Sequence, residues 1–285
     1  MKFRSQVYRL KDAYRKLSVP QFTIVTGLVI IFFGTLILSS PLCSSSKVGL
    51  WEAFFTSTSA ITITGLTIID IGVDLNFFGQ VFLAFMLLSG GLGLMAITTF
   101  LQGFVVKGTE LRTRLDKGKT LDEFGVGGIG RTFQSIAITA TCIISLGAIV
   151  LYSFGFVDIQ NNWERLWSSI FHSISAYNNA GFSLWSNSLQ DYRTNFLVNT
   201  VFVFLIVMGG LGWRVIDDIW SHKKNLSYKK LSLHSKLVIR TSLSLILFGS
   251  LGFFITESLL NSQFFNDLNL FERLMSSTTR VPYRR

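Results

Sequence analysis

The sequence predicts an all-α polytopic membrane protein with about five transmembrane helices. Of its 285 residues, 49% are hydrophobic and only 15% are charged, whereas soluble domains carry about 25% charged residues. Several apolar stretches reach the ~20 residues that cross the hydrocarbon core of a bilayer. Basic residues gather in every second connection between these stretches, as expected for a chain that crosses a membrane repeatedly.

Five apolar stretches are the candidate spans. The first four hold no charge in their apolar part, and the fifth holds only Arg240. We expect them at residues 22–40, 77–106, 132–157, 196–211 with its flanks, and 237–255. The first stretch is not read as a signal peptide, because its basic flank is long and its apolar run is long enough to span.

The net charge of +10 is distributed in a way that orients the chain. Residues 1–20 hold six Lys and Arg, residues 105–131 hold six and residues 221–236 hold five, whereas the alternate connections hold only Lys47, Arg165 and Arg193. The positive-inside rule then predicts a multi-pass protein of the cell (inner) membrane with a cytoplasmic N-terminus. Anionic membrane lipids are the expected partners of the basic segments, and nucleic acid is not.

A repeat of 116 residues organises the chain. Residues 50–68 read "LWEAFFTSTSAITITGLTI" and residues 166–184 read "LWSSIFHSISAYNNAGFSL". Both begin with Leu-Trp, reach Ser-Ala and carry a glycine, Gly65 or Gly181, at the same place. Each copy follows a spanning helix and precedes a helix with "GGLG", whose glycines favour close helix packing or, alternatively, a hinge.

The repeat predicts the domain organisation. Each unit is a helix, a half-length helix, a loop and a second helix, and a third unit begins but stops at "VPYRR". This ending suggests a frame change or a truncated gene. The expected divisions are a cytoplasmic N-terminus (1–20), repeat 1 (21–106), a cytoplasmic linker (107–131), repeat 2 (132–222), a second linker (223–236) and an incomplete repeat 3 (237–285), with its half-helix starting at residues 270–280.

The loops after the half-helices are the candidate functional site. A helix of about eleven residues rises roughly 16 Å, half the thickness of the hydrocarbon core. Non-helical backbone at that depth is tolerated only inside protein or along a water-filled cavity, so each loop should line a pore. The partly negative C-terminal end of a half-helix favours a cation, and neither loop contains a basic residue that would favour an anion.

The segments "TSAITITGLTIID" and "FHSISAYNNAGFS" and the "GGLG" helices resemble the Trk/Ktr/HKT superfamily of potassium, sometimes sodium, uptake proteins. The likeness is greatest to the membrane subunit of the bacterial TrkH/KtrB type. It implies a pore of four such repeats, a homodimer and a cytoplasmic nucleotide-binding regulatory subunit. A glycine at the first filter position is associated in that family with potassium, and serine with sodium.

The resemblance assigns a filter but no cofactor. Potassium, with sodium as the alternative, would be the transported ion, bound only by backbone carbonyls. The carbonyls expected to bind it are those of Thr62, Ile63, Thr64, Gly65, Asn178, Asn179, Ala180 and Gly181.

Other readings remain open. With two complete repeats, the chain could be a truncated, non-conducting fragment or an assembly module of such a transporter. A secondary transporter of unrelated fold is disfavoured, because many of those use inverted repeats and these are parallel. The family pattern usually has an apolar residue and proline where this chain has Trp213-Arg214. We expect the long Arg214 side chain to extend its charged end to the membrane surface.

Further motifs give weaker signals. "GVGGIG", residues 125–130, fits a dinucleotide fingerprint but lacks the strand that such a site needs, so a flexible linker is expected. His172, His222 and His234 share no metal-ligand spacing, and His172 is expected to be a packed or capping residue rather than a pH sensor. No nucleophile and base are arranged for an enzyme.

Acidic residues follow both loops. Asp70 and Asp74 come after the first loop and Asp191 after the second. They could concentrate cations at the mouth of the pore, or they could be ordinary solvated side chains at the membrane surface.

Overall fold

The computed structural model describes residues 19–45, 48–91, 126–221 and 231–259. Within them the chain is helical apart from loops and one isolated bridge between Ser44 and Leu75. Most of the expected N-terminal segment, most of both linkers and the start of a third half-helix at residues 270–280 lie outside the described residues. The helices are α2 (Val19–Leu38), α3 (Leu50–Thr62), α4 (Ile71–Asp74), α5 (Phe77–Gly91), α7 (Val126–Val150, continued by a π-helical turn Leu151–Gly155), α8 (Asn162–Tyr177), a 3₁₀ turn (Gln190–Tyr192), α9 (Phe196–Leu211), α10 (Trp213–Ser221) and α11 (Leu233–Leu259).

The predicted all-α fold is confirmed, and the described part of each of the five apolar stretches lies on a helix. Among the residues that the structure describes, two helical stretches are long and apolar enough to cross a membrane, Gln134–Gly155 and Leu233–Gly252. The other three form shorter apolar helices, Ile24–Leu38, Phe77–Gly91 and Phe196–Leu211. For the second stretch, the structure describes only the part up to Gly91.

Large apolar side chains point outward from the outer helices. On α11, Leu245 and Phe248 are 72% and 75% exposed, and on α2, Leu28 and Phe32 are both 61% exposed. Water would solvate such a surface poorly, whereas lipid chains cover it at no cost. The exposed apolar faces therefore agree with a helical membrane protein.

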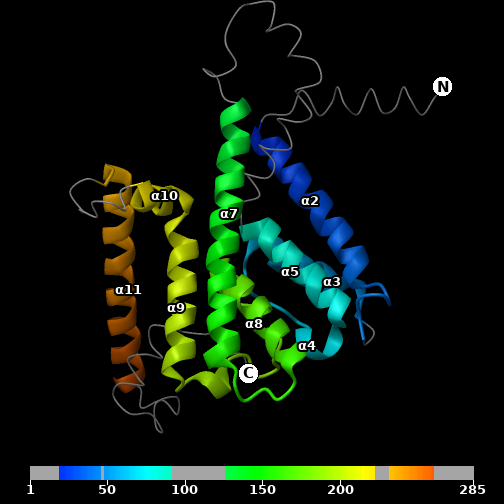
Figure 1. The fold of residues 1–285 in the computed structure, drawn as a ribbon. Coiled ribbons are helices and arrows are strands. Elements are labelled where there is room, and N and C mark those ends of the chain that lie inside the picture. The colour runs from blue at the N-terminus through cyan, green and yellow to red at the C-terminus, as the bar shows by residue number, and fades with distance from the viewer. Residues whose placement is uncertain (1–18, 46–47, 92–125, 222–230, 260–285) are drawn as a thin grey trace, which may run out of the picture.

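The helices that carry the apolar stretches alternate in direction, and α3 and α8, the short helix expected in each repeat, lie between them (Figure 1). Helix α3 has 13 residues, whereas α8 has 16 and is as long as α9, so the expected half length does not hold for α8. Helix α3 packs on α2 and α5, and α8 packs on α7 and α9. Helix α5 also contacts α8, which joins the two helical groups. Leu83 and Leu87 of α5 are fully buried, as are Phe171 of α8 and Leu205 of α9.

Side-chain caps fix where the short helices begin. The Asn161 side chain accepts a hydrogen bond from the Trp163 N–H at the start of α8, and the Glu52 carboxylate accepts one from the Gly49 N–H at the start of α3 (2.9 Å). Such caps satisfy backbone N–H groups that the first turn leaves unpaired. Both short helices thus have defined starts and direct their C-terminal ends into the following loops.

The expectation of a flexible linker through residues 125–130 is wrong for 126–130. Helix α7 begins at Val126, so the glycines of "GVGGIG" from 127 onward occupy its first turns. Each glycine in a helix costs about 1 kcal/mol relative to alanine. The long apolar helix that follows extends through them, because each residue added to an existing helix gains a backbone hydrogen bond. Helix α11 likewise begins at Leu233, inside the second expected linker.

Candidate functional site

The first loop begins with a residue in the left-handed conformation. Helix α3 ends at Thr62, and Ile63 follows with φ 55° and ψ 40°. The Thr64 N–H donates to the Ser59 carbonyl (2.9 Å), and Gly65 has φ 73°. For a β-branched residue, the left-handed region is uncommon and costs roughly 1–2 kcal/mol. The hydrogen bonds back to α3 hold Ile63 in this conformation.

The second loop has the same backbone shape 116 positions later. Asn179 has φ 54° and Gly181 has φ 71°. The Ala180 N–H donates to the Ser175 carbonyl (2.8 Å), the counterpart of the bond from Thr64 to Ser59. Asparagine enters the left-handed region more readily than isoleucine. Two different sequences therefore adopt one loop geometry.

The two loops touch each other. A Cβ atom added to Gly65 would collide with the backbone carbonyl oxygen of Ala180. Gly65 is therefore required both by its positive φ and by the lack of space. The structure thus brings together Gly65 and Ala180, which the sequence placed in one candidate filter.

The glycines of the "GGLG" segments allow close packing against the short helices. A Cβ on Gly90 of α5 would lie 2.6 Å from the Ile61 carbonyl oxygen, and one on Gly209 of α9 would collide with that of Tyr177. Ile61 and Tyr177 are equivalent in the repeat. The helix that follows each loop therefore presses on the C-terminal end of its own short helix. This agrees with the packing role expected for these glycines.

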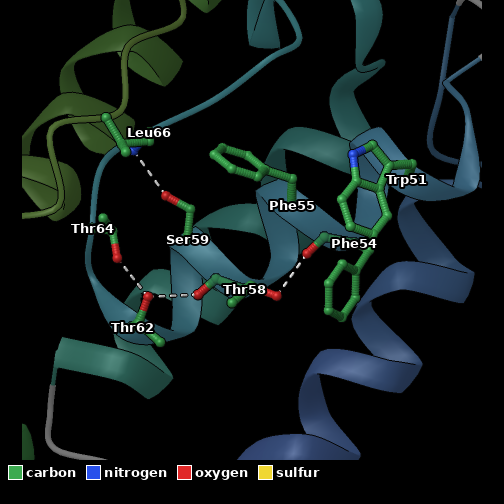
Figure 2. A pocket seen from close by; sticks show the side chains of 8 residues that line it. All are labelled: Trp51, Phe54, Phe55, Thr58, Ser59, Thr62, Thr64 and Leu66. Atoms are coloured by element: carbon green, nitrogen blue, oxygen red, sulfur yellow. Dashed lines mark hydrogen bonds between the residues drawn. The ribbon is translucent and has the colours of Figure 1, made fainter.

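A chain of threonine hydroxyls runs along α3 into the first loop (Figure 2). The Thr62 hydroxyl donates to the Thr58 carbonyl (2.8 Å), so the Thr64 hydroxyl must donate to Thr62 (2.6 Å). These groups border a cavity of about 200 Å³, with aromatic side chains at its other end. Its lining comprises Trp51, Phe54, Phe55, Thr58, Ser59, Thr62, Thr64 and Leu66.

Two serines on the short helices hold the residues that follow the loop glycines. Ser59 Oγ accepts from the Leu66 N–H (2.8 Å), and Ser175 Oγ donates to the Phe182 carbonyl (2.7 Å). Both serines are buried. The sequence did not predict this role, although the recurrence of Ser-Ala at a spacing of 116 residues was its visible signal.

The acidic residues beyond the loops make local hydrogen bonds. Asp70 caps α4 by accepting from the Gly72 N–H (3.1 Å), and Asp74 accepts from the Asp70 N–H (2.8 Å). Asp191 accepts from the Asn187 side chain (2.5 Å). These bonds show that the carboxylates shape the connections after the loops. Their effect on cations at the mouth of a pore stays a prediction.

His172 is buried in an aromatic cluster beside the second loop. Its ring stacks on Trp185 with centroids 4.2 Å apart and meets Phe156 edge to face. Nδ1 must donate to the Ser168 carbonyl (2.8 Å), which leaves Nε2 of the neutral ring to accept from the Ser183 hydroxyl (3.0 Å). His172 therefore packs and positions the chain after Gly181, as its reading as a packed residue anticipated.

Tyr192 borders the same cluster and lies on the connection before α9. Partial burial raises the pKa of its phenol above the ordinary value, and the nearby charges of Asp158 and Asp191 act in the same direction. The phenol thus stays neutral at physiological pH and packs as an aromatic group.

The fold and the paired loops define an α-helical membrane protein in which α3 and α8 each end in a loop of the same backbone shape. Residues 20–272 match the TrkH family of cation transport proteins, so the chain belongs to that family. The family is one of transporters rather than enzymes.

Curated relatives carry names of potassium uptake proteins. The chain is 32% identical over 243 residues to the Ktr system potassium uptake protein B of Bacillus subtilis, covering 85% of this chain and 54% of that protein. It is 33% identical over 252 residues to the potassium/sodium uptake protein NtpJ of Enterococcus hirae, covering 87% and 55%. It is 30% identical over 239 residues to the Ktr system potassium uptake protein B of Vibrio alginolyticus, covering 84% and 52%. The chain therefore spans about half the length of the curated relatives it matches.

Proposed function

We propose that this chain belongs to the membrane subunit of a potassium uptake system, in which monovalent cations pass along the two loops. The observation that carries the proposal is the pair of loops with one backbone shape that meet at Gly65 and Ala180. The ion would be coordinated by backbone carbonyls of Thr62, Ile63, Thr64, Gly65, Asn178, Asn179, Ala180 and Gly181. It is the transported substrate, and the proposal includes no cofactor.

The electrostatics of the loops support a cation as the substrate. Helices α3 and α8 both end at a loop, so the partial negative charge of each helix C-terminus lies there. Residues 62–66 and 178–182 include no Lys or Arg. Backbone carbonyls can replace the water shell of a potassium or sodium ion. The names of the relatives, one of which includes both ions, favour potassium as the main substrate.

The proposal also covers topology and partners. The alternation of basic segments supports a multi-pass protein of the cell membrane with its N-terminus in the cytoplasm. By resemblance to the family, we propose a homodimer with a cytoplasmic nucleotide-binding regulatory subunit. Anionic lipids would contact the basic segments.

Rubidium uptake tests the function. Cells that lack their own potassium uptake systems would express this 285-residue chain, with membrane insertion measured by immunoblot. We expect uptake that Gly65→Ala abolishes, because the added Cβ meets backbone at a positive φ. Gly249→Ala on α11 is the matched control, since nothing lies within 4 Å of its added Cβ, and its uptake should equal that of the unchanged chain.

An inserted chain without uptake would contradict the proposal for this chain acting alone. The alternative is then an assembly module that joins a longer member of the family. Co-expression with a tagged full-length relative decides between the two. Co-purification, together with uptake that depends on Gly65 of this chain, would favour a shared pore.

A further inference from the structure

We propose that Ser59 and Ser175 are positioning residues that set the geometry of the two filter loops. The Ser59 hydroxyl does so by accepting a hydrogen bond and the Ser175 hydroxyl by donating one. This proposal rests on the function proposed above for the same loops. Neither side chain is among the filter residues themselves. Each lies on a short helix, four residues before the residue in left-handed conformation, at Ile63 or Asn179.

In the first repeat, the serine holds an amide. Ser59 is 4% exposed, and its Oγ lies 2.8 Å from the Leu66 nitrogen. A backbone N–H can only donate, so the hydroxyl oxygen is the acceptor. The Ser59 carbonyl also accepts from the Thr64 N–H (2.9 Å). One residue of α3 therefore fastens the chain on both sides of Gly65.

In the second repeat, the equivalent serine holds a carbonyl. Ser175 is 3% exposed, and its Oγ lies 2.7 Å from the Phe182 carbonyl oxygen. A carbonyl can only accept, so here the hydroxyl is the donor. The Ser175 carbonyl accepts from the Ala180 N–H (2.8 Å). The same two-point attachment thus encloses Gly181, with the second bond reversed.

The reversal makes the two loops unequal for an ion. The Phe182 carbonyl already accepts a hydrogen bond from a buried hydroxyl, so one of its two lone pairs is not available to an ion. Leu66 is the equivalent of Phe182 in the first loop, and its N–H donates to Ser59 Oγ. Within residues 48–91, no hydrogen bond is donated to the Leu66 carbonyl. The carbonyl after the glycine is therefore less available to an ion in the second loop than in the first.

Two other serines provide matched controls. Ser57 and Ser173 lie two residues earlier on the same helices and are also equivalent in the repeat. Both are buried with 0% exposure, and the hydroxyls of both lack a hydrogen-bond partner within the described residues. Changing a serine with a buried, unpartnered hydroxyl to alanine removes that hydroxyl and leaves no partner group unsatisfied. Ser57→Ala and Ser173→Ala should therefore leave the loops in place.

Hydrogen exchange tests the attachment without requiring transport. The purified chain and its variants would be measured by mass spectrometry in lipid nanodiscs. Ser59→Ala should accelerate exchange of the Leu66 amide about fivefold, the effect of one ordinary hydrogen bond. Ser175→Ala should accelerate exchange across residues 179–184. Exchange in either loop equal to that of its control serine variant would overturn the proposal.

Ion selectivity tests the consequence for the filter. In rubidium uptake with sodium as competitor, Ser59→Ala and Ser175→Ala should each raise the KM for rubidium about fivefold at unchanged membrane insertion. They should also lower the preference for rubidium over sodium, because loosened carbonyls no longer fit one ion size. Ser57→Ala and Ser173→Ala should stay within twofold of the unchanged chain.

The two experiments separate failure of this proposal from failure of the proposed function. If the unchanged chain takes up no rubidium, the function fails, while the exchange measurement still decides the role of the serines. If the unchanged chain transports but both serine variants keep its KM and its ion preference, the positioning role fails and the function stands.

Discussion

Replacing Gly65 by serine should change which ion passes the loops. Gly65 has φ 73°, where an L-residue other than glycine pays roughly 1–2 kcal/mol. The added Cβ would also collide with the Ala180 carbonyl oxygen, a backbone atom that cannot rotate away. Overpacking of this kind typically costs about 1–3 kcal/mol. The loops must therefore move apart or reorient, and carbonyls that coordinated one ion size will fit it less well.

Competition uptake measures this effect. We expect Gly65→Ser to raise sodium permeation relative to rubidium, and detergent-solubilised Gly65→Ser protein to unfold at a lower temperature than the unchanged chain. Gly249→Ser on α11, where the added Cβ meets no atom within 4 Å, is the control for a serine placed at a helical glycine. An unchanged ion ratio and an unchanged unfolding temperature in Gly65→Ser would refute the reasoning, since both consequences follow from one collision.

Three further substitutions test the packing around the loops by thermal unfolding of the solubilised protein. His172→Phe should keep the stack on its aromatic neighbour but remove two hydrogen bonds, at a cost of about 1–3 kcal/mol; equal stability would show that those bonds contribute nothing. Trp167→Phe removes the bond from its indole N–H to the Gln80 side chain (2.7 Å), which links α8 to α5, and should cost about 1 kcal/mol, whereas the same change at the exposed Trp163 should cost less. Gly209→Ala should destabilise the chain more than Gly249→Ala, because only the former collides with backbone, and the reverse order would argue against close packing of α9.

The sequence predicted the helices well because lipid-facing helices need long apolar stretches. The described parts of all five stretches lie on helices, and α3 begins at Leu50, as its repeat suggested, whereas α8 begins at Asn162, before the repeat start at Leu166. The glycines of both loops were identified from their spacing, and both have positive φ. These features follow from local rules of hydropathy and backbone sterics.

Other features depend on contacts that a sequence does not display. The contact of Gly65 with Ala180 arises only when α5 packs on α8 and brings the loops together. Ile63 in the left-handed region contradicts its intrinsic preference, and only the bonds to Ser59 explain it. The opposite directions of the hydrogen bonds made by the Ser59 and Ser175 hydroxyls could not be predicted, because a hydroxyl can either donate or accept.

The two loops have the same backbone shape although their side chains differ in chemistry. Ile63 and Asn179 adopt nearly the same φ although one is apolar and the other polar. A chimera that carries the sequence of residues 62–65 at positions 178–181 should therefore keep the path of the main chain while it changes the polarity of the surface beside it. The four residues of one loop could then be varied while the hydrogen bonds of Ser59 and Ser175 continue to fasten each loop to its own helix.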